Sequence, residues 1–534
     1  MTSRYEMGAP TRGRREFLGQ VGRGMLAASV GFSLAVDLGL ARADDVDSDQ
    51  DRLSFGRWDE WVDFLQSTPT DRLLPGVMDR INRGASLEDA VTAAALANAR
   101  AFGGEDYIGF HTLMALRPAL TVAASLPRSH AALPVLKVLY RNSARMQDVG
   151  GMEAQALRPL GDVTGPRPTE FDPTVRDAVR RRDLGAAEAA LARGLAQSPQ
   201  LGFDLVMSAV EDGAEVHRVV LIERAWDLVP LVGEERASAM LRQSLHYCVK
   251  NEEWASQHFA DLRRVLPDVL DRHALDRKAL GDRSFSDAEL QDWAKLLFSV
   301  TPAEAAEATG QALADGYSVR TIAEAVSLAA TQLVLRDVGR VGNQIVPGKP
   351  EGSVHGDSIG VHACDSANAW RRLALVTNGR HAAAATILGA YQVAMDRVGR
   401  GGDFANWQPL PNADDENTFA ESTPARLLEQ LHETIQGNAQ AEAVAVTSQY
   451  LKRVREEVAD ANVEGLYQAF ARYATSEDGA LHAEKFFRTV RDEFDATRAT
   501  FRDNHVLALA RVTASEFGNP APGYAESREL LGLE

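Results

Sequence analysis

Helical periodicity is the feature that most constrains the fold of this 534-residue chain. Apolar residues recur at spacings of three and four, the pattern of a helix with one buried face. Alternation of Val, Ile and Thr between turns, which would indicate strands, is almost absent. The sequence therefore predicts an all-α fold. The clearest helical segments, rich in Ala, Leu, Glu and Arg, are 86–101, 184–196, 215–229, 233–250, 302–314, 318–336, 437–456 and 479–494.

A sequence motif that ends in histidine occurs twice. The string Asp106-Tyr-Ile-Gly-Phe-His111 matches Asp357-Ser-Ile-Gly-Val-His362. In each copy a His-Ala-Ala motif follows 19 residues later, at His130 and at His381. A weaker match is an Asp-Gly-Ala motif shortly before His217 and before His482. Such self-similarity is typical of an internal duplication, although Ala-rich helices can also resemble one another by composition alone.

The duplication predicts a helical bundle or array built from two similar halves. The predicted boundaries are an N-terminal segment at 44–66, a first half at 67–265, a connector at 266–284, a second half at 285–517 and a C-terminal tail at 518–534.

The first 43 residues have the features of a Tat-type signal peptide. Arg14-Arg15 is followed by Phe17-Leu18, then by a weakly apolar stretch at 21–40 and by Ala41-Arg-Ala43, a typical cleavage site. We therefore expect the Tat translocase to export the folded protein to the periplasm or beyond, with cleavage after Ala43. No other segment approaches 18 consecutive apolar residues, so the sequence predicts no stable membrane span.

Net charge and cysteine content limit the partners and cross-links that are expected. The charge is −18 for the whole chain and becomes −21 without residues 1–43, which hold six Arg and three acidic residues. This acidity argues against nucleic acid or an anionic membrane as the main partner. Cys248 and Cys364 are the only cysteines, and they could form one disulfide in an oxidising compartment or remain two buried thiols.

The duplicated histidines are the main chemical lead. Imidazoles from neighbouring helices, often joined by carboxylates, are a common way for a helical protein to bind a transition metal. His111 and His362 are the predicted primary ligands, and His130 and His381 the next candidates. Asp365 follows His362 by one helical turn and could complete the set. The expected cofactor is a transition metal, iron or copper rather than zinc.

Other interpretations of these residues remain open. A buried histidine is often a hydrogen-bonded core residue, and the chain has no HExxH, paired ExxH or CxxCH motif. It also lacks a GxSxG elbow, a Walker A loop and a dinucleotide-binding glycine motif. One alternative is a non-catalytic helical scaffold that binds a peptide, a glycan or a partner protein. Another is a metal-independent hydrolase or lyase that uses His362 and Asp365.

Gly109-Phe-His111-Thr-Leu-Met114, set among Ala-rich helices with scattered histidines, resembles the questin oxidase-like family. The resemblance covers the segments 84–120 and 316–376. That family is all-helical and is associated with flavin-free Baeyer–Villiger-type oxidation of aromatic polyketides, so the resemblance implies oxidative chemistry on a small molecule. It transfers no catalytic residue. The combined prediction is an exported, metal-binding oxidoreductase.

Overall fold

Helices form 71% of the structure, a computed structural model, and the residues it describes contain 24 α-helices and no strand. The described residues are 52–161, 164–169, 171–377, 379–404, 406–457 and 463–533. The predicted all-α fold is confirmed. The predicted signal peptide and cleavage site lie outside the described residues. Leu53–Glu534 form one compact unit.

Eight of the helices correspond to the eight segments that the periodicity predicts. The first part of the chain contains α2 (Asp59–Ser67), α3 (Thr70–Asn82), α4 (Leu87–Phe102), α5 (Tyr107–Ala124), α6 (Ala132–Asp148), α7 (Thr174–Arg180), α8 (Leu184–Leu195), α9 (Pro199–Val210), α10 (Val216–Val232), α11 (Ala237–Lys250), α12 (Glu252–His258) and α13 (Leu262–Arg272). The second part contains α14 (Asp287–Ser299), α15 (Pro302–Ala314), α16 (Val319–Leu335), α17 (Ile359–Val376), α18 (Gly379–Arg400), α19 (Ala413–Thr418), α20 (Pro424–Gln436), α21 (Gln440–Glu457), α22 (Glu464–Ser476), α23 (His482–Ala496), α24 (Asp503–Glu516) and α25 (Tyr524–Leu530).

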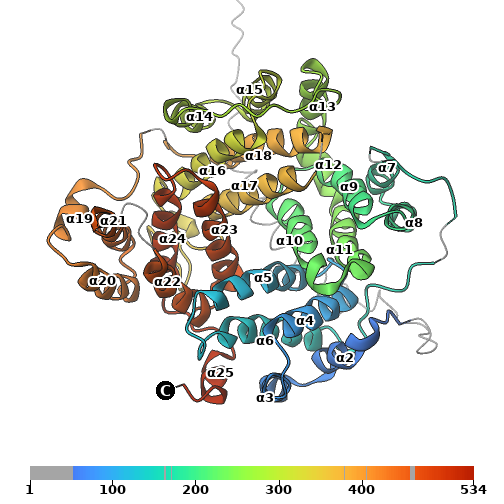
Figure 1. The fold of residues 1–534 in the computed structure, drawn as a ribbon, viewed down its shortest axis with the longest axis horizontal. Helices are drawn as coiled ribbons and strands as arrows, with labels where there is room; N and C mark the ends of the chain where they lie inside the picture. Colours follow the sequence, from blue (N-terminus) through green and yellow to red (C-terminus); the bar gives the residue numbers. More distant parts are fainter. Residues whose placement is uncertain are drawn as a thin grey trace, which may run out of the picture. The chain divides into compact units, whose positions relative to one another are not determined.

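Four helices, α5, α10, α17 and α23, surround the middle of this unit (Figure 1). Helix α5 packs against α10 and α23, and α17 packs against the same two helices, so the four form a closed ring of neighbours. Two of them come from the first part of the chain and two from the second. Residues far apart in sequence therefore meet at the centre.

The helices that carry the repeated motifs have corresponding packing partners. Helix α5 packs between α4 and α6, as α17 packs between α16 and α18. Helix α10 packs on α11, which also contacts α4, and α23 packs on α24, which also contacts α16. These pairs follow the order that a duplication predicts, and the duplication itself stays a prediction.

Local interactions fix where the central helices begin. Asp106, the first residue of the first motif, is the N-cap of α5, and it accepts a hydrogen bond from the Gly109 amide at 2.7 Å. In the second motif the N-cap of α17 is Ser358 and not Asp357. Arg340 and Lys349 bind the Asp357 carboxylate instead, at 2.7 Å each.

Two open questions from the sequence concern the cysteines and the membrane. Cys248 and Cys364 are both free and buried, so the structure contains two thiols rather than the disulfide. None of the helices in the described part of the chain has the length and apolar character needed to cross a membrane.

Candidate metal centre

Four histidines from the central helices meet in one cluster, which we call the histidine ring: His111, His217, His362 and His482. Each lies in the first turn or just beyond it, on α5, α10, α17 and α23 respectively. Because these four helices pack in a closed ring, their first turns bring the imidazoles together. His111, His217 and His482 are buried, and His362 is partly exposed.

The histidine ring consists of two close pairs. The Nε2 atoms of His111 and His217 are 3.2 Å apart, and those of His362 and His482 are 3.3 Å apart. Across the pairs, the ring centroids of His111 and His482 are separated by 5.5 Å, and those of His217 and His362 by 6.0 Å. Imidazole nitrogens bound to one metal ion at 2.0–2.1 Å lie roughly 3 to 3.4 Å apart, so each pair already has a suitable spacing.

The ring is not a complete ligand set as it stands. In the part of the chain that the structure describes, no group of three or more His, Cys, Asp or Glu side chains has the arrangement of a formed metal site. The imidazole centroids of the two pairs lie farther from each other than the centroids within a pair do. A metal ion bound by all four nitrogens would draw the pairs toward each other.

Hydrogen bonds to Nδ1 orient three of the four imidazoles. His111 Nδ1 lies 2.7 Å from the Tyr107 carbonyl oxygen, and His482 Nδ1 lies 3.2 Å from that of Gly479. His217 Nδ1 lies 2.6 Å from Glu215 Oε1. A carbonyl oxygen or a carboxylate only accepts hydrogen bonds, so we assign the imidazole proton to Nδ1 in each case. In a neutral imidazole, Nε2 then carries an unprotonated lone pair, which faces the centre of the histidine ring.

Glu215 supports His217 from outside the ring. Burial opposes ionisation of this carboxyl group, but the electrostatic effect of His217, hydrogen bonds from the His217 imidazole and amide, and one from the Tyr247 hydroxyl at 2.7 Å together lower its pKa to about 2. At metal centres a carboxylate often accepts a hydrogen bond from the outer nitrogen of a ligating histidine. It fixes the orientation of that imidazole and makes it a stronger ligand.

Electrostatics keep most of the ring uncharged. Burial is the largest cause that lowers the pKa of His111 and His482 well below the ordinary value and that of His362 to about 3. The nearby ammonium of Lys485 lowers all three further. These imidazoles are therefore neutral at neutral pH, the form that binds metal ions.

The backbone before His482 is strained. Ala480 and Leu481 have φ values of 47° and 65°, in the left-handed region that residues with a side chain rarely adopt. Two such residues in succession cost roughly 2 kcal/mol or more, and strain of this kind concentrates at functional sites. Here it sets the direction in which α23 begins and hence the position of His482.

Asp365 lies one turn below the ring rather than in it. It is buried, and its Oδ1 accepts a hydrogen bond from Thr489 Oγ1 at 2.7 Å. Burial raises the pKa of its carboxyl group, against the effect of Lys485. The structure thus places this predicted ligand next to the site, in the same layer as Lys485.

The structure separates His130 and His381 from the ring. Helices α5 and α17 each have 18 residues, so each is about 27 Å long. His111 and His362 lie at the beginnings of these helices, whereas His130 and His381 follow their ends. The constant spacing of 19 residues therefore reflects helix length and not a shared site. His130 is partly exposed and lies 2.9 Å from Ser129 Oγ.

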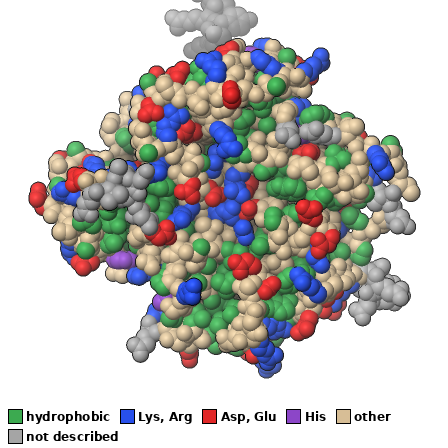
Figure 2. All heavy atoms as spheres, viewed as in Figure 1, with side chains coloured by type: hydrophobic (Ala, Val, Ile, Leu, Met, Phe, Trp, Pro, Cys, Tyr) green, Lys and Arg blue, Asp and Glu red, His purple; other side chains and the backbone are tan. Residues whose placement is uncertain are grey.

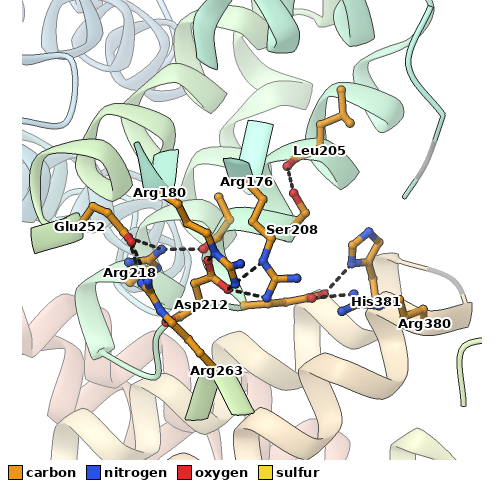
Figure 3. Close-up of polar contacts among 12 residues, drawn as sticks. Arg176, Arg180, Leu205, Ser208, Asp212, Arg218, Glu252, Arg263, Arg380 and His381 are labelled. Carbon is orange, nitrogen blue, oxygen red and sulfur yellow. Dashed lines mark hydrogen bonds and ion pairs between the residues drawn. The ribbon is translucent and has the colours of Figure 1, made fainter. Parts of the chain in front are cut away.

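His381 belongs to a separate polar cluster between α7, the end of α9 and the start of α18 (Figure 3). Its Nδ1 is 2.5 Å from Glu211 Oε1, and Arg380 binds the other carboxylate oxygen at 2.6 Å. Figure 3 shows Arg176 and Arg180 converging on Asp212, whose pKa they lower to about 2 although burial opposes this. The cluster is a network of ion pairs that joins the two parts of the chain.

A groove of about 540 Å³ opens at the other end of the central helices. Figure 2 shows basic and acidic side chains gathered in the middle of the viewed face, over α10, α17 and α23. Arg372 lies there between Asp227 at 3.0 Å and Asp492 at 3.3 Å. The two basic residues that line the groove, Arg371 and Arg372, are both paired with carboxylates.

Comparisons with protein-family models, with curated proteins and with solved structures give no match. The geometry of the histidine ring is therefore the basis for any functional conclusion.

Proposed function

We propose that this protein binds one transition-metal ion through His111, His217, His362 and His482 and uses it for oxidoreductase chemistry on a small molecule. All four ligands are imidazoles, which suit iron, copper, nickel and zinc. A redox role favours iron or copper over zinc. The resemblance to the questin oxidase-like family points in the same direction.

The observation that carries the proposal is the contact between His111 and His217. When both imidazoles are neutral and Nδ1 donates to a carbonyl oxygen in one and to an ionised carboxylate in the other, both Nε2 atoms present lone pairs. Two bare nitrogens 3.2 Å apart repel each other. A cation between the rings removes the repulsion, and a metal ion does so for both pairs at once.

A shared proton is the simplest competing explanation. A single proton would lie between the nitrogens of only one pair. It would not explain why both pairs of Nε2 atoms lie in the same cluster. Placing a proton on His111 is also unfavourable, because burial lowers its pKa well below the ordinary value. Neutral imidazoles held by outer hydrogen bonds are what a metal ion requires.

One side of the histidine ring borders on exposed residues. Tyr107 and Ile108, in the first turn of α5, are 46% and 40% exposed. The Tyr107 ring lies 4.4 Å from that of His111, and His362 is itself partly exposed. These residues form the side from which a substrate would approach the metal.

The convergence of the histidines also separates this proposal from the binding-scaffold alternative. A scaffold predicts histidines scattered through separate cores.

The proposal keeps the expectation of Tat-dependent export to the periplasm or beyond. It is compatible with folding before export, since the ring needs both parts of the chain. N-terminal sequencing of the exported protein should begin at Asp44.

Metal analysis tests the central claim. Protein purified from its native host, or reconstituted with Fe(II), Cu(II) or Zn(II), should contain about one equivalent of metal. The double variants His111→Ala/His362→Ala and His217→Ala/His482→Ala should each retain less than about a tenth of an equivalent. His130→Ala is the matched control and should bind like the wild type.

Two results would contradict the proposal in different ways. If the wild type binds none of the three metals, or if the double variants bind as well as it does while folded by circular dichroism, the histidine ring is not a metal site. If the native protein holds zinc alone, metal binding stands and the redox role is wrong.

A further inference from the structure

Lys485 is a buried cation beside the histidine ring. It follows His482 by three residues on α23, so the two side chains lie on the same face one turn apart. It is 3% exposed. This spacing puts its side chain within one helical turn of the histidine ring, and the electrostatic effect of its charge also lowers the pKa of His111, His362 and His482.

This lysine differs from the other buried basic residues of the central helices. Lys137 lies 2.7 Å from Glu484, and Arg488 lies 2.8 Å from Asp227. Lys485 Nζ, in contrast, makes no hydrogen bond and has no carboxylate oxygen within 4.0 Å among the described residues. Asp365 and Glu484 act on it only at longer range.

An ammonium group on a buried side chain without a hydrogen-bond partner is unfavourable, because it has lost most of its water and gained no protein acceptor in exchange. A divalent metal ion in the histidine ring would add further positive charge nearby. The four helix N-termini around the ring add partial positive charges of the same sign. Glu215 contacts only the His217 side of the site, so among the described residues no carboxylate contacts the ammonium group of Lys485.

We infer that Lys485 binds the negatively charged group of a small anionic ligand that also coordinates the metal ion. This inference rests on the proposed function. The ligand class is a small monoanion or a carboxylate, with one atom on the metal and one accepting a hydrogen bond from Nζ. At the positions equivalent to Lys485, three residues after His111 and His217, the chain has the uncharged Met114 and Val220. We therefore place the anion on the side of α23.

Azide binding to the copper-loaded protein tests the inference. Azide is a small monoanion whose coordination to Cu(II) gives a visible absorption band. We expect Lys485→Met to bind one equivalent of copper. Its affinity for azide should be at least about tenfold lower, because one charge-assisted hydrogen bond is lost. Lys485→Arg should keep the affinity within about threefold. Lys452→Met, which removes an exposed lysine, should match the wild type.

The outcomes separate the two proposals. Equal azide affinity in Lys485→Met and the wild type, both with full copper, overturns the inference and leaves metal binding intact. Failure of the wild type to bind copper overturns both. The thermal midpoint of the metal-free protein gives a second test. Lys485→Met should unfold at a higher temperature than the wild type, since it removes an unpaired buried charge. A variant that unfolds at a lower temperature, or does not fold, overturns the inference.

Discussion

Glu215→Gln is the substitution that best tests how the histidine ring is supported. Glu215 caps α10 by accepting hydrogen bonds from the amides of His217 and Arg218 at 3.0 Å each, and it also holds the His217 ring. Its pKa falls from an ordinary 4.5 to about 2 in the folded protein. Since each tenfold change in proton affinity is worth about 1.4 kcal/mol, the ionised carboxylate contributes about 3 kcal/mol at neutral pH.

The pH dependence gives the prediction its sign. A carboxyl group whose pKa is lowered by folding stabilises the protein above its unfolded pKa, and this stabilisation is lost as the pH falls from 4.5 toward 2. Urea unfolding should therefore show the variant to be less stable than the wild type by about 3 kcal/mol at pH 7. The difference should shrink steadily between pH 5 and pH 3.

The same variant should also weaken the metal site. Loss of a carboxylate behind a ligating histidine typically costs about 10- to 100-fold in metal affinity. Glu289→Gln changes an exposed capping carboxylate of α14 and should leave metal affinity unchanged. A stability difference that does not vary with pH, or an unaltered metal affinity, would refute the role assigned to Glu215.

Three further substitutions test interactions elsewhere in the helical unit. His381→Gln should lower the thermal midpoint more at pH 6 than at pH 9. Although burial opposes protonation, a neighbouring carboxylate raises the pKa of His381, so the stabilisation is present below about 6.5 and is lost as the pH rises through the folded pKa. Lys137→Met leaves the fully buried Glu484 without its partner and should cost about 3–5 kcal/mol in denaturant unfolding. Gly104→Ala should destabilise more than Gly84→Ala: both have positive φ, but a Cβ at Gly104 would lie 2.0 Å from the Gln243 carbonyl oxygen, whereas Gly84 is open.

Of the four central helices, the periodicity predicted α10 and α23 but not α5 and α17. Helix α15 shows why some helices are easily predicted: it has one apolar face and begins at a capping box, so its periodicity is visible. Helix α5 is buried on nearly all sides, and a helix that is apolar all round gives a weak periodic signal. Its presence was indicated mainly by the repeated motif that contains His111.

The candidate site was predictable only in part for a related reason. A motif repeated within the chain identified His111 and His362, but the repeated spacing of 19 residues also selected His130 and His381, which lie beyond the far ends of α5 and α17. His217 and His482 had only a short Asp-Gly-Ala motif in common. Their place in the ring depends on how α10 and α23 pack against α5 and α17, a long-range contact that no local pattern specifies.

The two close histidine pairs have a consequence for unfolding. Each pair lies within one part of the chain, His111 with His217 and His362 with His482, and only the packing of the central helices closes the ring. A bound metal ion would therefore act as a removable cross-link between distant segments. With metal, the two parts should lose structure in one transition. After chelation they are free to separate first, so calorimetry before and after chelation would measure how firmly the two parts hold together on their own.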